Sequence, residues 1–351
     1  MPAVTKGKVL VSGCNGFVAV WVVKQLLEDG YTVRGTVRKD SAIPYLKDLF
    51  KSYGDRFEVV IVPDITKDGA FDDAVKGVDA IEHLASPFHM HADDPQELIG
   101  PAVAGTLSVL RSALAHGNAT VRRVVITSSC AAVLTEDPDL SKARTYAEGD
   151  WNELAIDDCA QNRRGADQAS KYHASKALAE RAAWEFAASH RGEAMFDVVA
   201  LNPPYVYGPW MHDVKNAEQL NTSMFAFWDA VIKGNKSMEE LATEGQSWVD
   251  VRDLAHAHAL ALQRPEAGGE RIIVSSGPWN WQDFVNTAHA LEPSLPAGNT
   301  AYDPKTAVYH TSFDNSKSRR VLGIEYRTME ECTRDSLAQF KAKGWMWSVA
   351  V

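Results

Sequence analysis

Cysteine is scarce in this chain of 351 residues, which contains only Cys14, Cys130, Cys159 and Cys332. These four are widely separated and form no CxxC pair, so the spacing indicates neither a disulfide framework nor a cysteine zinc site. The pattern is typical of a reducing compartment, and we predict a cytoplasmic location. The first residues lead directly into a predicted strand, without the separate apolar segment of a signal peptide.

Basic residues are also in deficit, with 36 Lys and Arg against 46 Asp and Glu and a formal net charge of -10. This balance argues against nucleic acid or an anionic membrane as the main partner. We see no apolar run long enough to span a bilayer. The histidines occur as two pairs, His89/His91 and His256/His258. The two members of each pair are two residues apart, so they cannot share a helix face, and no carboxylate cluster accompanies them at ligand spacing. We therefore predict no metal site and a small-molecule partner.

What remains is the composition of an ordinary globular protein, with 45% hydrophobic and 23% charged residues. Short apolar runs alternate with helical patterns, which is typical of βαβ units. The sequence therefore predicts an α/β fold, a Rossmann-type doubly wound parallel sheet. Predicted strands are 8–12, 31–37, 57–62, 78–84, 121–127 and 195–201, and predicted helices are 16–29, 101–116 and 168–190.

The length exceeds that of one compact core, which favours two units sharing a ligand cleft. The alternation stops after Tyr205, and later segments are richer in Pro, Trp and helical patterns. We assign residues 1–204 and 246–277 to a dinucleotide-binding domain, and residues 205–245 and 278–351 to a smaller, mostly helical substrate domain. The polar stretch 136–167 is predicted to be a loop over the carboxyl edge of the sheet.

The segment SGCNGFVA at 12–19 combines the end of a strand, a glycine turn and the start of a helix. A sharp turn needs Gly13, and close approach of a pyrophosphate needs a residue without a side chain at Gly16. An ordinary tight βα turn is the alternative, and the position after the first strand favours the dinucleotide site. The predicted contacts here are Gly13, Asn15, Gly16, Phe17 and Val18.

The second strand ends in Arg38 and Lys39, where an NAD enzyme presents an acidic residue to the ribose 2′-hydroxyl. A guanidinium there can pair with a 2′-phosphate through a fork of donors. We therefore predict NADPH as cofactor, with NADH binding more weakly. A solvated basic surface is the alternative, and Asp40 nearby leaves dual specificity open.

Tyr172 and Lys176 form a YxxxK motif within a helical pattern, so they lie one turn apart on one face. A cation beside the phenol favours the phenolate and brings its pKa closer to neutrality, which suits proton exchange. The strand that ends at Ser128 and Ser129 delivers hydroxyls to the same edge of the sheet. Their alternative role is to cap the strand end.

Several motifs together resemble the extended short-chain dehydrogenase/reductases, within them the dihydroflavonol 4-reductase-like group that includes yeast methylglyoxal reductase and fungal aldehyde and ketone reductases. The resemblance covers nearly the whole chain. Its motifs are SGCNGFVA at 12–19, GYTVRGTVR at 30–38, PDI at 63–65, HLASPF at 83–88, TSS at 127–129, YHASK at 172–176 and NPPYVYGP at 202–209.

This resemblance implies that Ser129 polarises a carbonyl, that Tyr172 donates the proton and that Lys176 lowers the tyrosine pKa and holds the nicotinamide ribose. It also implies further cofactor contacts, at Asp64, Ile65, Ala85, Ser86, Pro203 and Val206. The chain departs from the pattern at Ser12, which replaces the usual threonine, and at Ala19, which replaces a third glycine. We identify no residue for the asparagine that some relatives add to the catalytic set.

An apolar wall is predicted around the site from aromatic and aliphatic residues on these segments, with ordinary interdomain packing as the alternative. Its members are Phe88, Val133, Tyr205, Tyr207 and Trp210. The expected function is NADPH-dependent reduction of ketones and aldehydes, including keto esters and α-dicarbonyls. A nucleotide-sugar epimerase or dehydratase of the same fold and a non-catalytic NADP-binding regulator are the alternatives. The resemblance suggests a monomer or homodimer.

Overall fold

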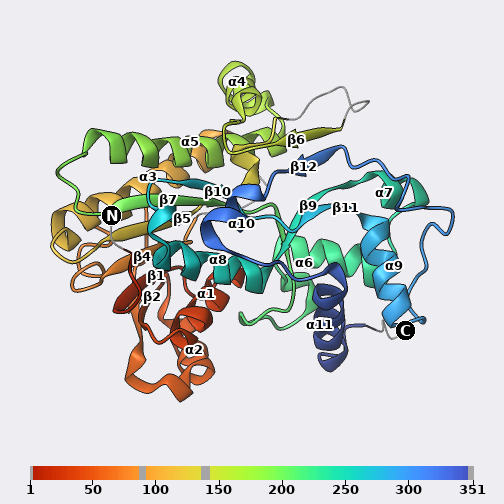
Figure 1. The fold of residues 1–351 in the computed structure, drawn as a ribbon, viewed down its shortest axis with the longest axis horizontal. Helices are drawn as coiled ribbons and strands as arrows, with labels where there is room; N and C mark the ends of the chain where they lie inside the picture. Colours follow the sequence, from red (N-terminus) through yellow and green to blue (C-terminus); the bar gives the residue numbers. More distant parts are fainter. Residues whose placement is uncertain (1–2, 87–91, 136–142, 347–351) are drawn as a thin grey trace.

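A seven-stranded parallel sheet forms the centre of the molecule (Figure 1). The computed structural model describes residues 3–86, 92–135 and 143–346. The strand order is β3-β2-β1-β4-β5-β7-β10, so the chain reverses its direction of travel between β1 and β4. The carboxyl ends of strands at such a reversal are where open α/β sheets bind ligands. The strands are β1 (Lys8–Ser12), β2 (Thr32–Val37), β3 (Phe57–Ile61), β4 (Ala80–His83), β5 (Arg123–Thr127), β7 (Asp197–Asn202) and β10 (Arg271–Ile273).

Helices cover both faces of this sheet, because successive strand residues point to opposite sides. Val9 and Val11 join the core formed with α1 (Phe17–Glu28) and α8 (Val251–Gln263). Leu10 joins the opposite core, formed with α3 (Gln96–Ser112) and α5 (Gln168–Ser189). Strands buried on both faces have nearly continuous apolar sequences, as β1 and β5 do. The predicted doubly wound α/β fold is confirmed.

One helical segment of the described chain, Gln96–Gly117, is long and apolar enough to cross a membrane by length and composition alone, with a mean hydropathy of 1.5. The expectation that no run reaches this length is therefore wrong for this segment. The segment comprises α3 and its continuation, and 56% of it is buried inside the molecule, where α3 packs on α5. Core helices of this kind pass the same test, so the finding is weak evidence for a membrane span.

Beside the main sheet lies a small sheet, which the sequence did not predict. We call this sheet, with the helices and the aromatic core around it, the second unit. In it β9 (Gly245–Asp250) pairs with β8 (Tyr205–Tyr207) in parallel and with β11 (Gly277–Asn280) antiparallel. Aromatic side chains from the sheet and the helices around it form a shared core. The helices are α6 (Thr222–Phe227), α7 (Met238–Thr243), α9 (Trp281–Leu291) and α11 (Met329–Ala342).

The predicted loop at 136–167 contains regular structure in its described part, so that expectation is wrong there. Residues Arg144–Tyr146 form β6, which pairs with β12 (Thr311–Phe313), and Glu153–Asn162 form α4. The side chain of Asn152 caps α4 by accepting the Ala155 N–H at 3.0 Å. In the helix sequence ELAIDDCAQN the buried residues are only Ala155 and Cys159, four apart, which is a short signal for a helix. The remaining helices are α2 (Ile43–Leu49) and α10 (Ser316–Leu322).

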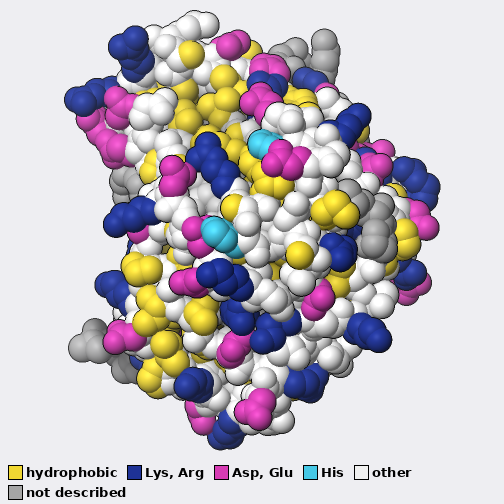
Figure 2. Space-filling view, turned by 90° about the vertical axis from the view of Figure 1, so that its left-hand side faces the viewer, with side chains coloured by type: hydrophobic (Ala, Val, Ile, Leu, Met, Phe, Trp, Pro, Cys, Tyr) yellow, Lys and Arg dark blue, Asp and Glu magenta, His cyan; other side chains and the backbone are white. Residues whose placement is uncertain are grey.

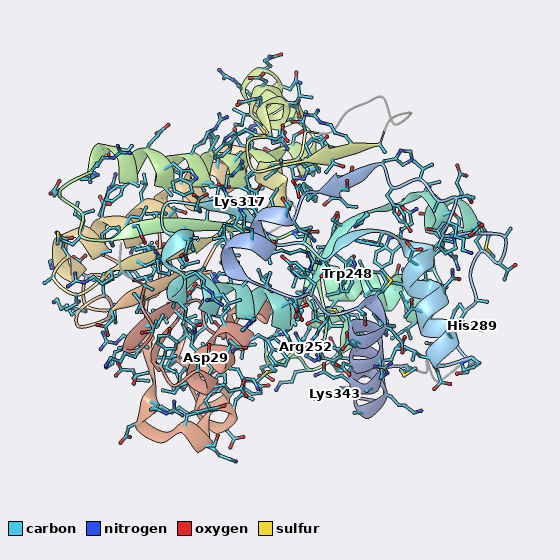
Figure 3. The ribbon with its side chains drawn as sticks, viewed as in Figure 1. Asp29, Trp248, Arg252, His289, Lys317 and Lys343 are labelled. Carbon is cyan, nitrogen blue, oxygen red and sulfur yellow. The ribbon has the colours of Figure 1, made fainter. Side chains whose placement is uncertain are left out.

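Ion pairs join the C-terminal helix α11, and the residue just before it, to helix α8. Arg252, labelled in Figure 3, donates to both oxygens of Asp250, at 2.9 Å from Nε and 2.8 Å from Nη2, and also to Asp335 of α11. Arg327, which lies just before α11, pairs with Asp253 of α8. Because Asp250 and Asp253 are buried, these arginines also neutralise charges that would otherwise be costly to bury.

Candidate active site

The glycine turn between β1 and α1 offers an anion-binding surface. Gly13 has φ 64°, which favours glycine, and a Cβ there would lie 3.1 Å from the Ala85 Cβ. Gly16 precedes α1 with extended backbone and no side-chain cap, and the first turn of the helix carries no acidic residue. A Cβ on Gly16 would meet nothing closer than the Gly13 carbonyl oxygen at 3.4 Å. The uncapped N–H groups and this open space fit a pyrophosphate.

The other predicted residues of this turn face different surroundings. Asn15 is exposed and Val18 half-buried. The Phe17 side chain packs into the aromatic core of the second unit, so the N-terminus of α1 lies where the two units meet.

Ser12 holds the turn against the end of β4. Its Oγ accepts the backbone N–H of Leu84 at 2.9 Å and that of Ala85 at 3.0 Å. The hydroxyl lies 3.0 Å from Nδ1 of His83, whose pKa burial lowers to about 4, so this imidazole is neutral at physiological pH. Ala85, predicted to contact the cofactor, therefore lies beside Gly13, and exposed Ser86 follows it.

The predicted adenosine contacts gather at the carboxyl ends of β2 and β3. Arg38 and Lys39 are exposed directly after β2. Asp64 accepts hydrogen bonds from the Thr66 N–H at 3.0 Å and the Thr66 hydroxyl at 2.6 Å, and these bonds lower the pKa of its carboxyl. Ile65 is half-buried and packs against Gly105 of α3. An exposed cationic pair at the end of β2 fits a 2′-phosphate.

The structure brings Ser129, Tyr172 and Lys176 together at the end of β5. The Ser129 side chain hydrogen-bonds the Tyr172 hydroxyl, and Lys176 Nζ lies 6.0 Å from the centroid of the tyrosine ring. Helix α5 carries the latter two residues, and its N-terminus is fixed by Asp167, which accepts the Ala169 N–H at 2.8 Å. A hydroxyl, a phenol and an amine at one edge of the sheet can together move a proton. We call these three residues the catalytic set, after their predicted role.

The two serines that follow β5 have different partners. Ser128 is buried, and its Oγ donates to Glu180 Oε2 at 2.5 Å. Ser129 is half-buried and lies with Tyr172, while its Oγ also accepts the Ala131 N–H at 3.1 Å. Ser129 thus caps the turn, as in the alternative interpretation of the sequence, and faces the phenol as well.

The electrostatics of the pair differ from the prediction. Burial raises the pKa of Tyr172 and outweighs the Ser129 hydrogen bond, which lowers it, while Tyr205 and Cys130 raise it further. Burial lowers the pKa of Lys176 to about 8, against the opposing charge of Glu180. The phenol is therefore protonated at neutral pH, which is the form that a proton donor needs.

The predicted apolar wall divides between two places. Tyr205 is 44% exposed, and its electrostatic effect on Tyr172 shows that it lies near the catalytic set. Tyr207 and Trp210 are buried in the aromatic core of the second unit, where the Tyr207 ring packs on Trp279 and Phe284.

The remaining predicted contacts lie around the end of β5. Val133 is fully buried, and Val206 is half-buried on β8. The Pro203 carbonyl accepts the Cys130 N–H at 2.8 Å, which joins this segment to the serine turn. Phe88 lies outside the described residues. The contacts of all these residues with substrate or cofactor stay predictions.

Sequence reasoning missed a buried polar network behind the serine turn, formed by Glu180, Asn202 and Arg271. The available signal was the spacing of Glu180, which lies four residues after Lys176 on α5. The sequence also missed Lys171, whose buried ammonium donates to the carbonyls of Ala92, Asp93 and Arg164. It thereby fixes the start of α5 to neighbouring segments.

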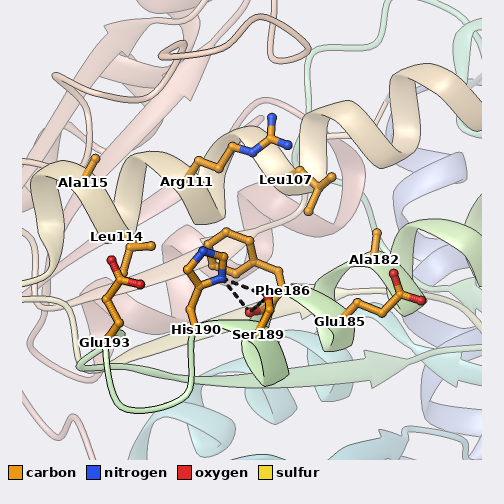
Figure 4. Close-up of a pocket in the computed structure, with 10 residues that line it drawn as sticks. All are labelled: Leu107, Arg111, Leu114, Ala115, Ala182, Glu185, Phe186, Ser189, His190 and Glu193. Carbon is orange, nitrogen blue, oxygen red and sulfur yellow. Dashed lines mark hydrogen bonds between the residues drawn. The ribbon is translucent and has the colours of Figure 1, made fainter.

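A groove of about 650 Å³ lies elsewhere, between α3 and α5 (Figure 4). Leu107 of α3 and Leu114, two residues beyond the end of α3, line it together with Phe186. The His190 ring stacks on Phe186 with centroids 4.1 Å apart. Phe186 comes fourteen residues after Tyr172 on α5, which is roughly 21 Å along the helix. The groove is therefore separate from the catalytic set.

The described residues contain no group of three or more His, Cys, Asp and Glu side chains that could hold a metal ion. On the face drawn in Figure 2, basic and acidic side chains are interspersed with small hydrophobic patches. A phosphate contact at the exposed Arg38 and Lys39 stays a prediction.

The fold and site together define an extended Rossmann protein of the short-chain dehydrogenase/reductase class. The model of the NAD dependent epimerase/dehydratase family matches residues 9–275. Ketoreductase azaE of Aspergillus niger is 35% identical over 341 residues, covering 94% of this chain and 96% of that protein. NADPH-dependent methylglyoxal reductase GRE2 of Saccharomyces cerevisiae is 33% identical over 346 residues, covering 94% and 97%.

A solved structure supports the same family assignment. Yeast methylglyoxal/isovaleraldehyde reductase Gre2, complexed with NADPH, superimposes with a TM-score of 0.85 at 33% identity, covering 96% of this chain and 99% of that one. The chain belongs to the NAD dependent epimerase/dehydratase family, and the predicted resemblance is confirmed.

Proposed function

We propose that this chain is an NADPH-dependent carbonyl reductase that converts ketones and aldehydes, keto esters and α-dicarbonyls among them, to alcohols. The chain is an oxidoreductase, its cofactor is NADPH, and carbonyl reduction in general agrees with the activities named for its relatives. The observation that carries the specific proposal is the meeting of Ser129, Tyr172 and Lys176 at the carboxyl end of β5.

The cofactor would be held by groups from two strand ends, those of β1 and β2, and from helix α5. The N–H groups at the start of α1 would bind the pyrophosphate beside Gly13 and Gly16, and Arg38 and Lys39 would pair with the 2′-phosphate. The reduced nicotinamide supplies a hydride when bound. Lys176 would donate to the nicotinamide ribose from its place on α5.

The protein's own residues would manage the carbonyl oxygen. The Ser129 hydroxyl hydrogen-bonds this oxygen and polarises the carbonyl, and the Tyr172 phenol gives its proton to the alkoxide that forms. The nearby Lys176 ammonium stabilises the phenolate that is left. Tyr205, exposed at the end of the second unit, would provide an apolar contact for the substrate.

The experiment that tests this proposal is a screen of NADPH oxidation over aliphatic, aryl and dicarbonyl substrates, with chiral analysis of the alcohols. We expect turnover with at least one class and a single predominant enantiomer from prochiral ketones. Conversion of a nucleotide sugar without NADPH oxidation would overturn the proposal in favour of an epimerase or dehydratase.

The absence of both activities, combined with tight NADPH binding, would favour a regulator. A cytoplasmic location and a monomeric or homodimeric state stay predictions.

A further inference from the structure

Glu180 is a buried carboxylate behind the catalytic set, with 2% of its surface exposed. It lies four residues after Lys176 and eight after Tyr172, so the three side chains follow one another along one side of α5. Burying a carboxylate is costly unless it is paired and hydrogen-bonded. Its partners are Ser128 Oγ at 2.5 Å, Asn202 Nδ2 at 2.8 Å, Trp184 Nε1 at 3.2 Å, and Arg271 Nε at 2.6 Å and Nη2 at 3.3 Å.

One oxygen of this carboxylate fixes the backbone that carries Ser129. Glu180 Oε2 accepts from Ser128 Oγ and from Asn202 Nδ2, and the same Nδ2 donates to the Ser129 carbonyl at 3.0 Å. The residues before and at Ser129 are thus held by one anion. Because the Ser129 hydroxyl also meets the phenol of Tyr172, a shift of this turn would change the geometry of proton transfer.

The other oxygen is anchored by Arg271, which keeps the anion in place. The guanidinium carbon lies 3.7 Å from the centroid of the Trp151 ring. The remaining donors of Arg271 reach the carbonyl oxygens of Glu148, Asp150 and Ala132. With the donors of Arg271 satisfied in this way, neither member of the buried pair is left with an unpaired charge. An unpaired buried charge is what makes such sites costly.

Glu180 also acts on the charge of Lys176. Burial lowers the pKa of Lys176 to about 8, and the Glu180 carboxylate raises it. On β4, His83 faces the ammonium but is neutral, with its pKa near 4. Tyr172, on the same helix, is a protonated phenol because burial raises its pKa. The ammonium thus depends on Glu180 for its favourable charge contact.

We propose that Glu180 is a positioning residue for the reductase: it holds the turn that carries Ser129, and it keeps Lys176 in the cationic form during proton transfer. This inference rests on the proposed function. It assigns a role in the reaction to a side chain that touches neither substrate nor cofactor.

The test is Glu180→Gln, compared with wild type by the pH dependence of kcat/KM for carbonyl reduction under saturating NADPH. The amide keeps the size of the side chain and removes its charge. We expect the basic limb of the kcat/KM profile, its fall at high pH, to move by about one unit to lower pH, because the charge that raises the pKa of Lys176 is gone. Above about pH 8 the variant should therefore show kcat/KM values up to about tenfold below wild type. The KM for NADPH should stay within about twofold of wild type, because Glu180 does not touch the cofactor.

Glu185→Gln is the matched control, because Glu185 is an exposed acid on the same helix. This substitution should leave the basic limb of the kcat/KM profile at its wild-type pH. Trp184→Phe removes one hydrogen bond to Glu180 without changing its charge. It should lower the melting temperature and leave the limb in place. An unshifted limb in Glu180→Gln, together with a lowered melting temperature, would show a structural role alone and overturn the proposal.

Leaving Arg271 unpaired could prevent Glu180→Gln from folding, and Glu180→Gln/Arg271→Met then serves, because it removes both buried charges. Its basic limb should still move to lower pH, since the charge that raises the pKa of Lys176 is Glu180. A wild-type limb in the double variant would equally overturn the proposal. Failure of the proposed function is distinguishable, because wild type itself would then reduce no carbonyl compound.

Discussion

At the scale of single residues, neighbours decide which of two identical side chains takes part in chemistry. Ser128 and Ser129 follow the same strand, and the sequence alone left both as candidates from the residue types. Side chains alternate in direction along an extended chain, so the two serines leave β5 toward different partners. Ser128 meets a carboxylate, whereas Ser129 meets the phenol of Tyr172. We therefore propose Ser129 as the serine whose hydroxyl meets the carbonyl.

Removal of the Tyr172 hydroxyl should lower the rate of carbonyl reduction without changing the affinity for NADPH. In Tyr172→Phe we expect carbonyl reduction to fall about 10²–10⁴-fold, the usual contribution of a general acid, while NADPH affinity changes little. Steady-state NADPH oxidation measures the first quantity and fluorescence titration with NADPH the second. Near-normal turnover in this variant would refute the assignment of Tyr172 as proton donor.

Carbonyl reduction should depend on pH through Lys176. The reaction needs the protonated forms of both Tyr172 and Lys176, and the lysine, with its pKa of about 8, loses its proton first. We therefore expect kcat/KM to be level below about pH 7 and to fall up to about tenfold per unit above about pH 8. A profile that stays level beyond about pH 9 would contradict this assignment.

The same group makes a contribution to stability. The native pKa of Lys176 lies below its ordinary value of 10.5, so the folded protein binds fewer protons than the unfolded chain between about pH 8 and 10.5. The contribution of this group to the free energy of unfolding should therefore rise with pH across that window, and Lys176→Met should abolish that rise in urea titrations at several pH values.

Discrimination between cofactors should depend on Arg38. Charge-assisted hydrogen bonds contribute about 1.5–3 kcal/mol each, so Arg38→Ala should weaken NADPH binding by roughly ten- to a hundredfold. NADH has no 2′-phosphate and should bind with nearly unchanged affinity. Dissociation constants for both cofactors, measured by calorimetry on wild type and variant, check this expectation. Equal losses for the two would exclude a 2′-phosphate contact.

At the scale of elements, the sequence predicted the main sheet and its long helices well. Strands such as Arg123–Thr127 are apolar on both faces, and the pattern of α5 ended within a residue of the observed helix. Short elements escaped prediction for physical reasons. The strands β8 and β9 pair across more than thirty residues of sequence. Helix α4 is short, and its Asn152 cap and its packing on α5 add to an apolar face of only a few residues.

The two glycines of the turn should respond differently to alanine. Gly13→Ala places a Cβ at φ 64° and 3.1 Å from the Ala85 side chain, which should cost ~1–3 kcal/mol in the free energy of unfolding. Gly16→Ala has an allowed backbone and open space, so its stability should stay within ~0.5 kcal/mol of wild type. Its NADPH affinity should nevertheless fall about tenfold or more, because the Cβ enters the pyrophosphate space.

Urea unfolding and NADPH titration of both variants separate these effects. Unchanged NADPH binding in Gly16→Ala would place the pyrophosphate elsewhere.

At the scale of the whole molecule, the catalytic set depends on contacts between segments far apart in the chain. Glu180 of α5 joins Asn202 of β7 and Arg271 of β10, and this network could not be predicted because its members share no local pattern. The Phe17 side chain likewise belongs to the core of the second unit although α1 starts in the first. The division into residues 1–204 with 246–277 and 205–245 with 278–351 stays a prediction, and β9 is paired within the small sheet.

Because the proposed cofactor contacts come from so many segments, NADPH should bind the folded molecule and not the unfolded chain. A ligand at a hundredfold excess over its dissociation constant then adds about 2.7 kcal/mol to the free energy of unfolding. Thermal denaturation followed by circular dichroism should show a melting temperature that rises with NADPH concentration, and a smaller rise with NADH at equal concentration. In Arg38→Ala the difference between the two cofactors should shrink, with Lys39 as the cation that remains for the 2′-phosphate. If NADH and NADPH stabilise wild type equally, the cationic end of β2 does not select the cofactor, since a 2′-phosphate contact adds affinity for one of them alone.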